Sequence, residues 1–254
     1  MKKPNPPFLQ LNFYYSTNKD SENLYMLTML LIKQKPEVIC RVSYVEFEGA
    51  KNTAFSSIST FDDIKELELN SFKIQDFFSN PNILIFKIEI NDVLLDIAKS
   101  FKIITFLSIS EDAVHIDNHP IAIFVDGEIF DRGNNRYRQK LFQVGDSAHK
   151  AFVEICDNTE PTYAAINVEY SIECKVDLEK DSRSYAFRDF FINKKLIIGS
   201  KIDLIKKIFD NGYIEQSMIG YYFSCTKYFN PKRIEFDSDI AILASIETAK
   251  ILIS

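Results

Sequence analysis

Two histidines four positions apart are the most specific candidate for chemistry in this sequence. His115 and His119 stand in the segment HIDNHP, which follows Glu111 and Asp112. Histidines at this spacing can bind one zinc ion when both lie on the same face of a helix. Pro120 disfavours a helical conformation at His119, and the Asp-Asn pair between the histidines is typical of a turn. We therefore expect an exposed loop here and assign no metal site to it.

The sequence contains no recognisable arrangement of residues for nucleophilic catalysis. No serine stands in a Gly-x-Ser-x-Gly turn, and no cysteine has a familiar catalytic neighbourhood. The third histidine, His149, is predicted to lie on the outward side of a helix. The cysteines are far apart and form no Cys-x-x-Cys pair, which predicts reduced, buried thiols in a cytoplasmic protein; they are Cys40, Cys156, Cys174 and Cys225. We assign no catalytic residue and no cofactor.

Paired glutamates are the remaining acidic candidates. Glu46 and Glu48 share one face of a predicted strand, and Glu169 and Glu173 line the polar face of another. Two carboxylates about 5–10 Å apart across a cleft can hydrolyse a glycoside. The same residues on an open face can instead attract a basic protein. We assign these four glutamates to partner binding.

One concentrated basic patch lies between residues 132 and 140. It combines arginines and a lysine with an aromatic side chain, a pattern that can contact phosphate or single-stranded nucleic acid; its members are Arg132, Arg136, Tyr137, Arg138 and Lys140. The whole chain, however, carries a net charge of −6, and most of the excess negative charge lies in residues 1–127. Nucleic-acid binders usually present a broad positive face. We therefore expect a solvated loop and no nucleic-acid partner.

The composition favours packed sheets and contact surfaces. The 254 residues include 22 Phe and 12 Tyr but only 7 Gly. Phosphate-binding loops and nucleophile elbows need glycine where the backbone approaches a ligand, whereas large aromatics suit sheets and interfaces. The longest apolar stretch, residues 24–32, is much shorter than the roughly 20 residues that span a bilayer. We expect a cytoplasmic protein without a membrane partner.

The patterns of apolar residues predict the elements that position these candidates. Alternation predicts strands over 8–15, 24–33 and 38–48, joined as an antiparallel meander, and further strands over 83–90, 103–109, 121–125, 163–174 and 220–229. Asp126-Gly127 predicts a hairpin to 128–130. Helices are predicted from Thr60, from Asp146 or Ser147, and from Ser200. A helix is also predicted over 239–253, where a strand is the alternative. The expected fold class is α+β, with mainly antiparallel sheet and three to four packed helices.

The predicted organisation is a flexible leader followed by one domain. Residues 1–7 contain three prolines and are expected to be flexible. Residues 8–254 are expected to form a single α+β domain, and two closely packed halves, 8–130 and 146–254, are the alternative.

The segment PTYAAINVEY at residues 161–170 and the later YFNP at 228–231 resemble immunity proteins found beside bacterial polymorphic toxins. The likeness covers roughly residues 150–232 and includes no catalytic motif. It implies a cytosolic bacterial protein that binds a toxin domain and blocks it by steric occlusion. It transfers no functional residue to this chain.

These observations favour a non-enzymatic protein that binds another protein. Carboxylates would steer a basic partner, and Tyr and Phe side chains would anchor it. Two alternatives remain: a hydrolase with a site built from dispersed carboxylates or from His115 and His119, and a self-assembling structural subunit.

Overall fold

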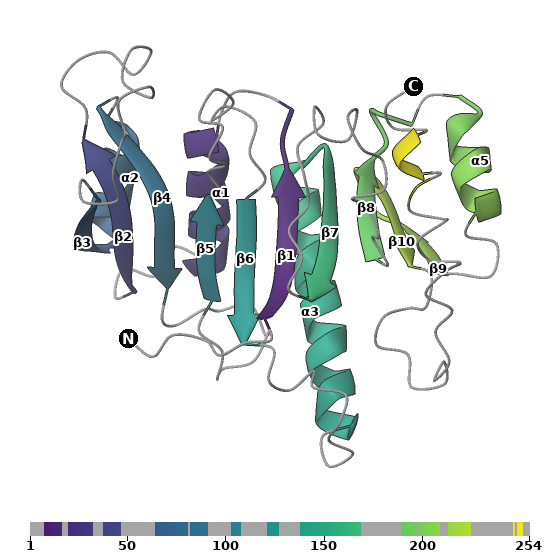
Figure 1. The fold of residues 1–254 in the computed structure, drawn as a ribbon, viewed down its shortest axis with the longest axis horizontal. Coiled ribbons are helices and arrows are strands. Elements are labelled where there is room, and N and C mark those ends of the chain that lie inside the picture. The colour runs from purple at the N-terminus through teal and green to yellow at the C-terminus, as the bar shows by residue number, and fades with distance from the viewer. Residues whose placement is uncertain are drawn as a thin grey trace.

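The structure is a computed structural model in which the ten described strands form one sheet (Figure 1). It describes residues 8–16, 20–32, 38–46, 64–80, 82–90, 103–107, 121–126, 138–168, 189–197, 199–208, 213–224, 246 and 248–250. The strand order is β3-β2-β4-β5-β6-β1-β7-β8-β10-β9. Every pairing between described strands is antiparallel, and helices accompany the sheet, so the α+β fold class is confirmed.

The described elements run along the chain in the following order. The first half contains β1 (Phe8–Tyr14), α1 (Asp20–Ile32), β2 (Ile39–Glu46), β3 (Lys65–Asn70), α2 (Ser71–Phe78), β4 (Ile83–Ile90), β5 (Ile103–Leu107) and β6 (Ile121–Asp126). The second half contains α3 (Arg138–Thr159), β7 (Tyr163–Val168), β8 (Asp189–Asn193), α5 (Lys201–Ile208), β9 (Tyr213–Gln216) and β10 (Gly220–Ser224). Residues 246 and 248–250 are also helical.

The first strand of the chain lies in the middle of the sheet. β1 pairs with β6 on one side, where Leu11 is opposite Ile123, and with β7 on the other, where Leu11 is opposite Ile166. The strands from residues 39–126 therefore form one wing of the sheet, and those from residues 163–224 form the other. The strands of both predicted halves thus pair into one sheet through β1.

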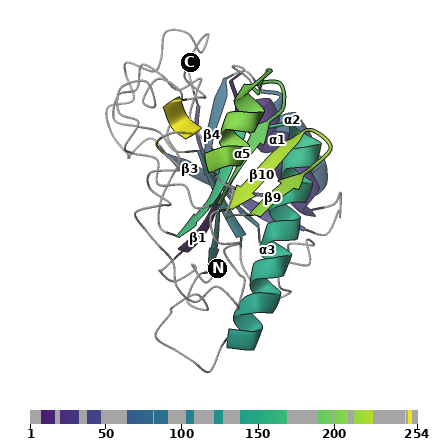
Figure 2. The ribbon, with the colours of Figure 1, turned by 90° about the vertical axis from the view of Figure 1, so that its right-hand side faces the viewer.

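The two faces of the sheet carry separate apolar clusters, because successive residues of a strand point to opposite faces. Phe13 belongs to the larger cluster and stacks on Phe152 of α3. Its neighbour Tyr14 belongs to the smaller cluster and stacks on Tyr163. Helices α1, α2 and α3 cover the first face, whereas α5 and the helical residues near the C-terminus lie on the second (Figure 2).

The predicted strand over residues 24–33 is wrong, and with it the meander. Residues 20–32 form α1, which separates β1 from β2 in the chain. Leu24, Leu27 and Leu31 are fully buried along one side of the helix, and Thr28 Oγ1 donates to the Leu24 carbonyl at 2.7 Å. A short apolar run fits a buried helix as well as a strand, and the leucines and methionines here favour helix.

The predicted helix from Thr60 is also wrong where the structure describes it. Residues 65–70 form β3, whose sequence KELELN alternates with a period of two. The helix begins after Asn70, whose Oδ1 accepts a hydrogen bond from Lys73 N at 3.1 Å. Asn70 is therefore the N-cap of α2, and the sequence signal placed the helix one element too early.

Other predicted elements agree with the structure in type. The helix predicted near Ser147 begins earlier, at Arg138, so that Asp146 and Ser147 lie inside α3 rather than at its cap. The helix from Ser200 is α5, and the strands near 8, 38, 83, 103, 121, 163 and 220 are confirmed over their described parts. The hairpin partner 128–130 and most of the helix predicted over 239–253 lie outside the described residues.

Candidate functional sites

Only one of the four glutamates assigned to partner binding lies in the described residues. Glu46 ends β2, is exposed, and forms an ion pair with Lys65 of β3. Glu48, Glu169 and Glu173 lie outside the described residues, as do His115 and His119. Arg138 and Lys140 of the basic patch belong to helix α3 rather than to a loop.

The first candidate site is the β3 edge, which we define as β3 with the adjacent residues Ile39, Glu46 and Phe72. Among the described strands, β3 pairs only with β2 and therefore ends the sheet. Its first four residues are exposed, and Leu69 is the buried one. An edge strand presents backbone N–H and C=O groups that can pair with another chain.

Charged side chains lie on both faces of the sheet at the β3 edge. Arg41 of β2 lies opposite Glu68 in the register and donates to Glu68 Oε1 at 3.0 Å. This hydrogen bond raises the pKa of the Arg41 guanidinium, and the nearby Glu66 and Glu89 act in the same direction. The ion pair with Glu46 likewise raises the pKa of Lys65. Both cations therefore stay charged, and each is held by a carboxylate.

Large apolar side chains flank these charges. Phe72 is 73% exposed, Ile39 is 49% exposed and Leu67 is 40% exposed. All three belong to β2, β3 or the first turn of α2, at one end of the sheet (Figure 1). The β3 edge thus combines backbone groups that no second described strand pairs with, acidic side chains and apolar anchors.

The second candidate site is a polar pocket of about 330 Å³ near the end of β1. Its described lining residues follow β1, belong to α1, α3 and β8, or lie in the turns after α3 and β8; they are Tyr15, Ser16, Asn23, Thr159, Glu160, Thr162, Asn193, Lys195 and Leu196. The pocket is not predictable from the sequence, where Glu160 and Pro161 indicate only the end of a helix.

Hydrogen bonds within the protein occupy most of the polar atoms of the pocket. Tyr15 Oη donates to Thr159 Oγ1 at 2.8 Å, and Thr159 Oγ1 donates to the Ile155 carbonyl at 2.8 Å. Burial raises the pKa of the Tyr15 hydroxyl, which stays protonated and remains a donor. Thr162 Oγ1 accepts from Ser16 N at 2.8 Å. These groups form a fixed wall.

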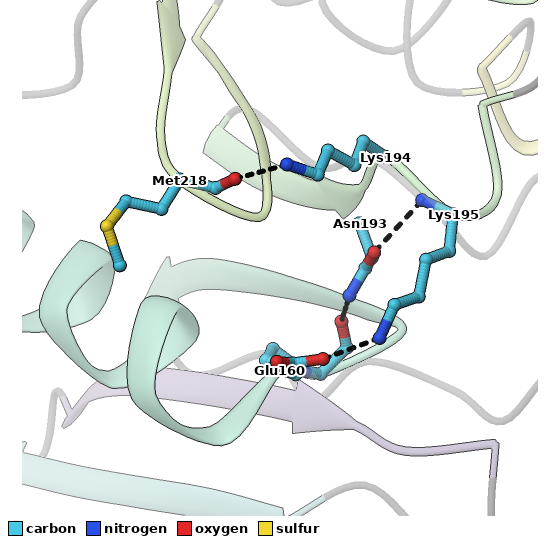
Figure 3. Close-up of polar contacts among 6 residues, drawn as sticks. Glu160, Asn193, Lys194, Lys195 and Met218 are labelled. Carbon is cyan, nitrogen blue, oxygen red and sulfur yellow. Dashed lines mark hydrogen bonds and ion pairs between the residues drawn. The ribbon is translucent and has the colours of Figure 1, made fainter.

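The turn after β8 directs two lysine side chains to opposite sides of the chain (Figure 3). Asn193 lies in the middle: its Nδ2 donates to the Pro161 carbonyl at 3.2 Å and its Oδ1 accepts from Lys195 N at 3.0 Å. Lys195 Nζ then reaches Glu160 Oε2 at 2.6 Å, whereas Lys194 points away to the Met218 carbonyl.

Glu160 has an unusual backbone conformation. Its φ of 51° is in the left-handed region, and among the described residues it is the only non-glycine residue with positive φ. It follows the last residue of α3, and its N–H donates to the Cys156 carbonyl at 2.9 Å. Glycine is the usual residue at such a helix end, because it has no Cβ to clash. The chain keeps a carboxylate at this position, beside the pocket, despite the strain.

Asn23 supplies a polar atom that the protein does not use. The residue is 5% exposed and lines the pocket, yet its Nδ2 makes no hydrogen bond. Buried polar groups in proteins are nearly always hydrogen-bonded, and an unpaired one costs about 1–3 kcal/mol. Asn23 Nδ2 is therefore a buried donor beside the pocket that no protein atom satisfies.

The prediction that His149 is an exposed helix residue is wrong. Its side chain is 18% exposed, because α3 packs against the second wing. Nε2 lies 3.1 Å from Glu215 Oε2, and the ring lies 4.4 Å from that of Tyr222. His149 thus links α3 to β9 and β10.

The described cysteines agree with the sequence analysis. Cys40 and Cys156 are fully buried free thiols in the larger apolar cluster. Burial raises the pKa of Cys40 to about 12 and raises that of Cys156 well above its usual value. Cys174 and Cys225 lie outside the described residues.

Comparison with protein families, curated proteins and solved structures finds no match for this chain. Within the described residues, no three metal-ligating side chains come together. The helices in this part of the chain also lack the combined length and apolarity that a membrane crossing requires.

Proposed function

We propose that this protein binds another protein, by accepting an extended segment of a basic partner as an additional strand beside β3. The observation that carries the proposal is the unpaired side of β3 in the described sheet, with acidic and apolar side chains around it. Strand addition draws affinity from backbone hydrogen bonds and specificity from alternate side chains.

The charges on β3 favour a basic partner strand. Glu66 and Glu68 point to the same face of the sheet and are exposed. A partner strand with Lys or Arg at two alternate positions would place each cation opposite a glutamate. Opposite charges directly across two strands stabilise the pair by about 0.2–1 kcal/mol, whereas like charges destabilise it.

The same charges disfavour self-assembly through this edge. If two copies of β3 pair antiparallel with their helices on the same face, a register centred on Leu67 places Glu66 opposite Glu68. Registers centred on Glu66 or Glu68 place that glutamate opposite itself. Each such arrangement brings like charges together. The edge therefore favours a foreign basic strand over a second copy of this chain.

Apolar anchors are available on both faces of the sheet at this edge: Ile39 shares the face of Glu66 and Glu68, Leu67 points to the opposite face, and Phe72 lies in the first turn of α2. Large apolar side chains in the centre of an interface contribute most of its binding energy, and charges around them contribute mainly to association rate and specificity. The net charge of −6 acts in the same direction, since it attracts basic partners at long range.

The class of partner proposed is a basic toxin domain, on the resemblance of residues 161–170 and 228–231 to immunity proteins. In this role the protein would neutralise the toxin by covering its active surface, with no reaction of its own. It would act in the cytoplasm of a bacterium that also encodes the toxin.

The test is capture of the partner by a tagged full-length chain in the source cell, with lysine cross-linking and mass spectrometry. We expect a basic protein to be recovered and to cross-link to Lys65 or Lys73, the lysines beside the β3 edge. The double variant E66K/E68K should lose the same protein.

The matched control is the double variant E154K/D203K. Glu154 and Asp203 are exposed on α3 and α5, so this variant changes the net charge equally but leaves β3 intact. It should retain the partner. Loss of the partner from both variants would mean that net charge alone drives binding, and retention by both would place the interface elsewhere; either result refutes the proposal.

A further inference from the structure

We infer that the polar pocket near the end of β1 binds a small zwitterion of the α-amino acid class. This pocket and the β3 edge lie in different parts of the molecule, so the inference does not rest on the proposed protein-binding function. Three features carry it: a closed set of internal hydrogen bonds, one unused buried donor, and a pair of opposite charges.

The first feature tells which groups are unavailable to a ligand. The hydroxyl of Tyr15 donates to Thr159, the Thr162 hydroxyl accepts from Ser16 N, and both ends of the Asn193 amide are occupied. These bonds come from residues far apart in the chain, and they fix the shape of the wall. A ligand can therefore be recognised only by the polar groups that these internal hydrogen bonds leave available.

The second feature is the donor at the wall. Asn23 is 5% exposed, and its Nδ2 has no hydrogen-bond partner. The group can be satisfied only by an acceptor atom, because an amide nitrogen donates and does not accept. A carboxylate oxygen of a ligand is such an atom, and a charged acceptor makes the stronger hydrogen bond.

The third feature is the ion pair at the pocket. Among the described lining residues, Glu160 and Lys195 are the only ionisable side chains with full charges, and they lie 2.6 Å apart. A ligand with a net charge would meet one attractive and one repulsive side chain. A zwitterion can place its ammonium group on Glu160 and its carboxylate on Lys195 and Asn23, and so engages both.

The exposure of the pair allows it to open. The Glu160 and Lys195 side chains are 50% and 73% exposed, and exposed ion pairs add little to stability. Replacing this ion pair by two contacts with a ligand therefore costs the protein little stability. The backbone of Glu160 keeps its carboxylate at the pocket, since the left-handed conformation is fixed by the end of α3.

The volume limits the size of the ligand. About 330 Å³ is at the lower end of the range for small-molecule sites, which is roughly 300–1,000 Å³. The pocket therefore suits a single amino acid rather than a nucleotide or a folded partner.

The test uses the full-length protein and each of the common L-amino acids as probes at about 10 mM, by ligand-observed NMR and calorimetry. We expect at least one amino acid with an uncharged side chain to bind with a Kd of about 1 mM or tighter. Its N-acetyl and methyl ester derivatives each lose one charge, and each should bind about tenfold more weakly.

Variants locate the binding in the pocket. Asn23→Asp should weaken the binding about tenfold, because it replaces the donor by an anion. Glu160→Gln and Lys195→Met should weaken it about fivefold each, and because both side chains are exposed these variants should fold. Glu154→Gln and Lys207→Met remove exposed charges elsewhere and should leave the binding unchanged.

Two results would overturn the inference. The first is that no amino acid binds at this concentration. The second is that binding occurs but is insensitive to the derivatives or to the Glu160 and Lys195 variants. Circular dichroism of each variant separates loss of binding from loss of folding.

Discussion

At the residue scale, Glu160 joins backbone strain to the candidate ligand site. A side chain in the left-handed region costs about 1–2 kcal/mol, and glycine avoids this cost. The ion pair with Lys195 compensates for little of it, since both side chains are largely exposed. Stability alone would therefore favour glycine after α3, and the glutamate points to a role in the pocket.

A substitution of Glu160 by glycine should consequently stabilise the protein while it weakens ligand binding. We expect the free energy of unfolding of Glu160→Gly to rise by up to about 1 kcal/mol, because the strain is released. Glu160→Ala keeps the strain and loses the ion pair, so it should be less stable than wild type by about 0.5 kcal/mol. Urea unfolding measures both, and the opposite order of stability would contradict this account.

The buried thiol of Cys40 predicts a dependence of stability on pH. Its pKa in the folded protein is about 12, well above that of an exposed thiol, because burial disfavours the thiolate. The stabilisation from keeping the thiol protonated is therefore complete below pH 9 and is lost as the pH rises toward 12. Stability should fall by about 1.4 kcal/mol per pH unit in this window from Cys40 alone.

The control is Cys40→Ala, measured by urea unfolding between pH 7 and about pH 10. The variant should show a smaller loss of stability above pH 9, although Cys156 still contributes in the same direction. Equal pH dependence in wild type and variant would exclude this role of Cys40.

At the element scale, the close packing of β8 against β10 depends on one glycine. Gly220 lies opposite Asn193, and an added Cβ would lie 2.3 Å from Phe191 Cζ and 2.4 Å from the Ile192 carbonyl oxygen. The carbonyl oxygen belongs to the paired strand, so it cannot move without separating the strands. Overpacking of this kind costs about 1–3 kcal/mol.

Gly220→Ala should therefore lower the free energy of unfolding by about 2–3 kcal/mol. The matched control is Gly199→Ala, where φ is 66° but no atom lies within 4 Å of the added Cβ. That variant should cost only the strain of the left-handed conformation, about 1 kcal/mol. Thermal unfolding of both variants compares the cost of the contact with β8 and the cost of the backbone strain. Equal losses of stability in the two variants would refute the role of the contact between strands.

Several elements could be predicted from the sequence, and the reasons for the failures are physical. Strand β7 and helix α5 have clear alternation or a clear helical stripe, and both were found. The run from Leu24 to Ile32 is apolar throughout, so its period could not separate helix from strand. The acidic residues before Leu67 are typical of the first turn of a helix, and they led to the wrong prediction for β3. The helix begins instead after Asn70, which is the N-cap of α2.

The sites were harder to predict than the elements. The position of Glu46 at the end of an alternating strand is visible in the sequence, and its role in partner binding stays a prediction. The pocket was not found, because Tyr15, Asn23 and Lys195 are far apart in the chain and come together only when β1 pairs with β7. An asparagine on an apolar helix and a glutamate where glycine is usual were the available signals.

At the scale of the whole molecule, β1 joins two wings that are otherwise separate in the chain. Removing the Phe13 side chain should cost about 3–5 kcal/mol, because the residue is fully buried between the sheet and Phe152. Since both wings depend on β1, they should lose stability together.

Hydrogen exchange of Phe13→Ala tests this cooperation. The amides of β2 and β4 in one wing, and those of β8 and β10 in the other, should show the same decrease in opening free energy. A decrease confined to one wing would show that the wings unfold independently and would contradict the central role of β1.

The central claim is that β3 receives a strand from a basic partner, and hydrogen exchange of the complex tests it most directly. Addition of a strand occupies the outward backbone N–H groups of residues 65–70. The account predicts that the captured partner slows exchange of these amides by at least about tenfold, and that E66K/E68K abolishes the effect. If the partner binds and slows exchange elsewhere while β3 exchanges as in the free protein, the claim is wrong.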